Sequence, residues 1–199
     1  LYYQAFFSLS MGIERLLKII LVQQYRVLHE GDFPTDMNLR QFSHDLRKLF
    51  AHAGISLDGR PLYPQIVAFL NDFAKKSRYY NIDHMLNDNV KCEDPLSAWY
   101  LLSRDILNTV PKRKTISGKQ QLAAMLDAVS VVRFYDLQGK EITDFMGVLA
   151  EAETRETIQA YSVQYLFEII TKLVEEVRRL EREKYLMPVL SEFFSLYHG

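Results

Sequence analysis

The stretch that decides the fold class is residues 3–28, YQAFFSLSMGIERLLKIILVQQYRVL, which contains no proline and a single glycine. Apolar side chains recur in it at the three- and four-residue spacing of one helix face, namely Leu9, Ile13, Leu16, Leu17, Ile20 and Val27. Such a stripe is wide enough to face a core, so we predict one long helix here. Glu14 and Lys18 are one turn apart, and we expect them to pair on its surface.

The same periodicity continues along the chain and predicts an all-α protein. Further helices are expected over residues 38–53, 65–78, 95–109 and 117–132, and from residue 142 or 154 to 184. Asn38 and Gln41 form a capping box for the first of these, which Gly54 ends. Asp94 followed by Pro95 is a typical helix start. Residues 134–143 are expected to form either a loop or a small hairpin around Gly139.

The last helix carries a stripe of apolar residues followed by closely spaced charges. Its stripe consists of Ile158, Tyr161, Tyr165, Ile169, Leu173, Val177 and Leu180. In its final turns, which include Glu181, charged residues occupy nearly all positions outside this stripe. A helix of this length is longer than a small bundle is wide. We therefore expect it to project, or to pack on the bundle or on a second subunit, and residues 189–197 to dock back on the body.

Composition limits the classes of protein to consider. The net charge of −1 provides no broad field for nucleic acid, so any such binding must use a local patch. Cys92 is the only cysteine, which excludes an internal disulfide and agrees with a reducing cytoplasm. No apolar run is long enough to span a bilayer, and no signal-peptide pattern is present, although the chain begins with Leu1. We expect a cytoplasmic protein without a membrane segment.

Known cofactor and metal motifs do not occur in the chain. The five histidines form no His-x-x-x-His pair, and a single cysteine cannot build a cysteine-rich zinc site. Neither a dinucleotide-binding glycine pattern nor a phosphate-binding P-loop is present. The prediction is that the protein holds no metal and no cofactor.

Residues 73–84, FAKKSRYYNIDH, combine Arg78 and His84, the two residue types needed for metal-independent RNA cleavage. His84 could act on the 2′-hydroxyl proton while Arg78 holds the phosphoryl oxygens. The alternative is a helix end with a solvated basic turn. Residues six apart on one unbroken helix are rotated by roughly 120°, so the two converge only at a kink or across a dimer.

Two further groups of polar residues could serve a ligand. Lys75 and Lys76, together with the basic loop residues Lys112, Arg113 and Lys114, could hold a phosphate backbone or be solvated charges. His44 and Asp45 lie off the apolar stripe of the predicted second helix. With Glu14 they could form a shared polar site, or they could belong to a capped surface helix.

The order of these features resembles the HEPN family (higher eukaryotes and prokaryotes nucleotide-binding domains). The resemblance covers residues 3 to about 110 and depends on Glu14 in the first helix, on Ser43-His44-Asp45-Leu46-Arg47-Lys48-Leu49, and on Ser77-Arg78-Tyr79-Tyr80. It implies an up-and-down helical bundle, commonly dimeric, that either cleaves RNA without metal or binds without catalysis. Arg78 and His84 match the spacing of the family's ribonucleases. Tyr79 departs from the small polar residue usual after that arginine.

The resemblance leads to a prediction about domains and function. We expect a bundle over residues 1–110 with a helical extension over residues 111–199. The expected function is a non-catalytic module that binds a partner protein, itself as a homodimer, or a nucleotide or RNA ligand. The alternative is a metal-independent endoribonuclease of toxin or phage-defence type that uses Arg78 and His84.

Overall fold

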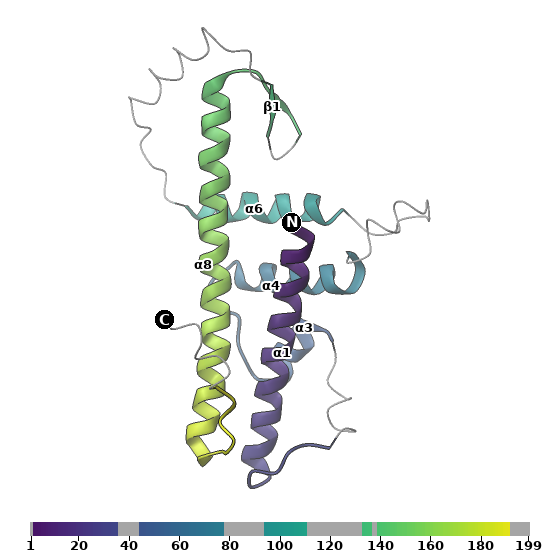
Figure 1. Ribbon diagram of the computed structural model, residues 1–199, viewed down its shortest axis with the longest axis vertical. Coiled ribbons are helices and arrows are strands. Elements are labelled where there is room, and N and C mark those ends of the chain that lie inside the picture. Colours follow the sequence, from purple (N-terminus) through teal and green to yellow (C-terminus); the bar gives the residue numbers. More distant parts are fainter. Residues whose placement is uncertain (1, 36–43, 78–93, 111–132, 137–138, 192–199) are drawn as a thin grey trace. The chain divides into compact units, whose positions relative to one another are not determined.

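The computed structural model of the 199-residue chain describes residues 2–35, 44–77, 94–110, 133–136 and 139–191. Apart from one short hairpin these residues are mainly helical, which confirms the all-α prediction (Figure 1). The chain forms two compact units. Unit 1 contains residues 1–95 and 165–199, and unit 2 contains residues 96–164. A domain boundary at residue 110 stays a prediction.

The predicted first helix is confirmed as α1 (Tyr2–Leu28), which is the central element of unit 1. Its apolar stripe is buried against α3 (Leu46–His52) and α4 (Tyr63–Asp72). At its N-terminal end Phe6 meets Phe69 and Phe73 edge to face, with ring centroids 4.8 and 5.4 Å apart. The buried core of unit 1 includes Ile13, Leu17, Ile20, Leu46, Leu49, Val67, Leu70, Ile169, Leu173 and Val177.

The predicted helix over residues 38–53 is wrong in its extent. The helix α3 begins at Leu46, residues 44 and 45 are not helical, and residues 36–43 lie outside the described ranges. Asp45, rather than Asn38, is the N-cap, and its carboxylate accepts the Lys48 amide at 3.2 Å. The buried side-chain oxygen of Asn71 accepts the Leu46 amide at 2.9 Å, so a residue of α4 fixes where α3 starts.

The third predicted helix is confirmed as far as Ser77, but its geometry changes along its length. After Asp72 the α-helix α4 continues as a π-helical segment, η1 (Phe73–Ser77). Segments of π-helix are rare and occur frequently at functional sites. Lys75 belongs to this segment, whereas Arg78 and His84 lie outside the described residues.

The predicted long C-terminal helix is confirmed as α8 (Phe145–Lys184), which has 40 residues. Its part within unit 1 buries the predicted stripe from Tyr165 to Leu180. Arg60 and Tyr63 hold this part through Glu168, with distances of 3.0 Å from Arg60 and 2.5 Å from the tyrosine hydroxyl. Residues 165–184 therefore pack on their own chain rather than projecting.

Unit 2 contains most of α6 (Pro95–Thr109), the first half of α8, and a hairpin. The strands β1 (Phe134–Tyr135) and β2 (Glu141–Ile142) pair antiparallel, with Phe134 opposite Ile142. The hairpin alternative for residues 134–143 is thus confirmed, and Gly139 at its turn has φ +77°. The predicted start of α6 at Pro95 is also confirmed. Within α6, Leu96 is exposed, whereas Leu102 and Ile106 are buried.

A buried polar network joins the C-terminal ends of α1 and α8. Arg26 donates to Gln23 Oε1 at 2.9 Å, and Gln23 donates to Glu181 at 2.8 Å. The Arg26 guanidinium also donates to the carbonyls of Gly31, Met187 and Pro188. Glu181 accepts the amides of Leu190 and Ser191 at 2.6 and 3.0 Å.

This network corrects the placement of Glu181 among exposed charges, because the residue is buried. It also confirms that the chain docks back after Pro188, up to Ser191. Residues 192–197 lie outside the described ranges.

Candidate functional site

A polar patch forms on unit 1 where α1, the start of α3 and η1 meet. Glu14 Oε1 accepts hydrogen bonds from Lys18 Nζ at 2.7 Å and from His44 Nδ1 at 2.9 Å. The predicted Glu14–Lys18 pair is confirmed, but the prediction that it lies on an open surface is wrong for Glu14, which is buried. The fold covers Glu14 by bringing residue 44 over this face of α1.

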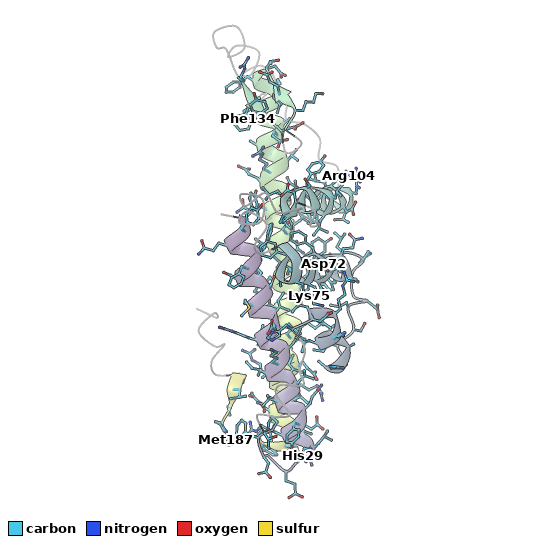
Figure 2. The ribbon with its side chains drawn as sticks, turned by 90° about the vertical axis from the view of Figure 1, so that its right-hand side faces the viewer. His29, Asp72, Lys75, Arg104, Phe134 and Met187 are labelled. Atoms are coloured by element: carbon cyan, nitrogen blue, oxygen red, sulfur yellow. The ribbon has the colours of Figure 1, made fainter. Side chains whose placement is uncertain are left out.

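The second part of the patch is centred on Asp45. Its Oδ2 atom pairs with Lys75 of η1, while its Oδ1 atom caps α3. Next to it, Arg47 lies 3.4 Å from Asp72, the last residue of α4. Figure 2 labels Asp72 and Lys75. We use the name α1–η1 patch for Glu14, Lys18, His44, Asp45, Arg47, Asp72 and Lys75.

Two carboxylates of the patch are less exposed than the side chains that bind them. The side chains of Glu14 and Asp45 are only 10% and 14% exposed. Their partners Lys18, Lys75 and His44 are 28%, 40% and 82% exposed. Glu14 and Asp45 therefore lie beneath Lys18, Lys75 and His44 and hold them in position. The Arg47–Asp72 pair is open to solvent, with 57% of the arginine side chain and 48% of the aspartate side chain exposed.

The environment shifts the pKa of both carboxyl groups. Burial raises the pKa of Glu14, but the hydrogen bonds and charges of Lys18 and His44 outweigh it and hold the pKa below its ordinary value. The hydrogen bond from Lys75 is the largest influence on Asp45 and lowers its pKa, against a smaller opposing effect of burial. Both groups are thus stabilised in the charged form.

We expect the Glu14 contribution to stability to depend on pH. Because the folded protein lowers this pKa, the contribution is present above the ordinary value of 4.5 and is lost as pH falls through the lowered value. Urea denaturation of the parent and of Glu14→Gln from pH 7 to pH 3 measures it. The advantage of the parent should shrink with acid, and a constant difference would contradict the assignment.

The structure brings together four of the residues selected from the sequence: Glu14, His44, Asp45 and Lys75. The others, namely the side chain of Lys76 and the residues Arg78, His84, Lys112, Arg113 and Lys114, lie outside the described part. Arg47, Asp72 and Lys18 were not among the site residues predicted from the sequence. The i, i+4 spacing of Glu14 and Lys18 could have indicated that Lys18 belongs to the site. No sequence pattern indicates the contact between Arg47 and Asp72, because they are 25 residues apart.

Unit 2 has a small cavity of about 170 Å³ between α6, the hairpin and α8. Its lining consists of Tyr100, Ser103, Arg104, Leu107, Asp136, Glu151, Thr154 and Ile158. Glu151 is paired with Arg155 at 2.8 Å. Of the selected residues that the structure describes, namely Glu14, His44, Asp45 and Lys75, none lines this cavity. Within the described ranges, no group of three or more His, Cys, Asp or Glu side chains is arranged to bind a metal ion.

Comparisons with known proteins give no assignment. No protein-family model matches the chain, and no curated protein and no solved structure is significantly similar to it. Among the helices of the described residues, none combines the length and apolar character needed to cross a membrane.

Proposed function

We propose that the chain is a non-catalytic helical binding module and that its α1–η1 patch binds the phosphates of a nucleotide or of RNA. The observation that carries this proposal is the arrangement of the patch, in which Lys18, Lys75 and His44 lie over the less exposed carboxylates of Glu14 and Asp45. Each side chain of the patch already has a hydrogen-bond or ion-pair partner on another helical turn or on another element. These contacts orient the cations before a ligand arrives, which lowers the entropic cost of binding.

Phosphate recognition fits the chemistry of these cations. Lysine and arginine neutralise phosphate oxygens, and the counterions that they displace from RNA make affinity fall with salt. The resemblance to the HEPN family supports RNA or a nucleotide as the ligand. With a net charge of −1, the chain offers little attraction beyond the patch itself, so the loss of one cation there should be measurable.

The test is fluorescence anisotropy of a labelled single-stranded RNA, titrated at several salt concentrations. We expect Lys75→Ala to weaken binding by about tenfold and to reduce the salt slope by roughly one. The matched control is Lys140→Ala, which removes the same charge from the hairpin turn of unit 2 and should bind like the parent. Equal affinities of all three proteins, or no binding by the parent, would contradict the proposal.

The endoribonuclease alternative is decided with the same RNA. If the chain is a non-catalytic module, the RNA should remain intact after incubation with the parent protein in the presence of EDTA. Cleavage that both Arg78→Ala and His84→Ala abolish, with helicity unchanged by circular dichroism, would replace the non-catalytic proposal with the ribonuclease. The cytoplasmic location, the homodimer and a protein partner stay predictions.

A further inference from the structure

The cavity of unit 2 is large enough for a small organic molecule. It has a volume of about 170 Å³ and lies between α6, the hairpin and the first half of α8. One water molecule occupies roughly 30 Å³ in the liquid, so the cavity exceeds the space of a single structural water. All its lining residues belong to unit 2, which makes it a feature of one compact unit.

A buried hydroxyl group at the wall of this cavity has no hydrogen bond within the protein. Ser103 of α6 lines the cavity, although the residue as a whole is only 2% exposed. Among the residues that the structure describes, none forms a hydrogen bond with its hydroxyl. Buried polar groups are normally hydrogen-bonded. The Ser103 hydroxyl is therefore placed to bond a molecule that enters the cavity.

The next residue along the chain supplies a cation to the same cavity. Arg104, labelled in Figure 2, is exposed, and within the described ranges its guanidinium forms no ion pair. The other two arginines described in unit 2 differ from it, because Arg133 binds Glu141 and Arg155 binds Glu151. A guanidinium without such a partner can bind a carboxylate through two parallel hydrogen bonds.

Two carboxylates line the cavity as well. Asp136 follows β1 and accepts the Lys140 amide at 2.8 Å, while Glu151 of α8 is bound by Arg155. An ionised carboxylate offers about four lone-pair sites, so each of these groups can accept further hydrogen bonds. Neither pairs with Arg104 in the described part of the chain. Charges of both signs thus line one cavity without neutralising each other directly.

We propose that this cavity binds a small zwitterion, namely an α-amino acid. The ligand carboxylate bonds the Arg104 guanidinium and the Ser103 hydroxyl. Its ammonium group donates to the carboxylates of Asp136 and Glu151. A ligand that carries both charges matches a lining of both signs, whereas a phosphate would be repelled by the carboxylates and a simple cation by the arginine.

The remaining lining indicates what kind of amino acid fits. Leu107 and Ile158 also line the cavity, which favours a ligand with an apolar side chain such as leucine. This inference goes beyond phosphate binding by the α1–η1 patch and does not depend on it, because the patch belongs to unit 1 and shares no residue with the cavity.

Isothermal titration calorimetry with three related compounds tests the inference. The parent should bind L-leucine, and it should bind N-acetyl-L-leucine and L-leucinamide at least about tenfold more weakly, because each lacks one of the two charges. Arg104→Gln should weaken leucine binding by about tenfold and abolish the preference for leucine over leucinamide. The matched control is Arg133→Gln, the same substitution outside the cavity of unit 2, which should bind leucine like the parent.

Ser103→Ala separates a ligand contact from a structural role. It should weaken leucine binding by about threefold to tenfold, the usual effect of one hydrogen bond. Its urea midpoint should equal that of the parent, because the hydroxyl bonds no other described residue. A lower midpoint would show that the hydroxyl serves the fold and would remove it from the proposed site.

Three results would overturn the inference as a whole. The first is a parent that binds no leucine up to the solubility limit of the amino acid. The second is equal binding of leucine and its two analogues, which would exclude recognition of a zwitterion. The third is equal affinity of Arg104→Gln and Arg133→Gln for leucine, which would place the binding site outside this cavity.

Discussion

Replacement of Arg26 by methionine should lower the free energy of unfolding by about 3 to 5 kcal/mol, the usual cost of removing one member of a buried charged network. Arg26 is 1% exposed. Its guanidinium donates hydrogen bonds to the Gln23 side chain and to three backbone carbonyls that follow the ends of α1 and α8. Methionine fills much of the volume but donates no hydrogen bond. The carbonyls would then remain without these donors, and Glu181, which is linked to Arg26 through Gln23, would stay buried in a network that contains no cation.

Urea denaturation followed by circular dichroism measures this effect. The matched control is Arg15→Met, the same substitution on the exposed side of α1, which should change stability by less than about 0.5 kcal/mol. If both variants lose the same stability, the network contributes nothing specific and the role assigned to Arg26 is wrong.

Truncation of Leu173 to alanine should cost about 2 to 5 kcal/mol, because the side chain is fully buried within unit 1. The lost energy combines the transfer of apolar atoms with the cavity that they leave behind. This prediction follows from the packing of residues 165–184 of α8 on their own chain. Were this part of the helix projecting into solvent, the same truncation would have little effect.

The control for Leu173→Ala lies on the same helix. Phe167 is exposed on α8, so Phe167→Ala removes a larger side chain but should cost less than about 0.5 kcal/mol in the same urea experiment. A smaller loss for Leu173→Ala than for Phe167→Ala would contradict the assignment of the buried face.

Four of the seven residues of the α1–η1 patch could be selected from the sequence, and the reasons differ from residue to residue. Glu14, His44 and Asp45 stood out because polar residues interrupt or flank apolar stripes, and Lys75 because it belongs to a basic turn. Their pairing could not be derived, since residues 30 positions apart in sequence form both the Glu14–His44 and the Asp45–Lys75 contacts. Arg47 and Asp72 were missed for the same reason.

The sequence by itself determined where most helices of the described residues lie, including α1, the start of α6 at Pro95 and the buried stripe of α8. Periodicity, capping residues and prolines act within one or two turns, so a local pattern is sufficient to place these elements. The hairpin around Gly139 was one of two local alternatives.

Only the tertiary structure decided where α3 begins and which charges are buried. Asn71 caps Leu46 from another helix, and Glu181 is enclosed with Arg26 although the sequence around it is as charged as an exposed helix. These outcomes depend on partners 25 to 158 residues away along the chain. A polar group can be buried without a large cost only when the fold places a matching hydrogen-bond donor or acceptor beside it. Because that partner comes from a distant part of the chain, the residues nearby in sequence do not predict it.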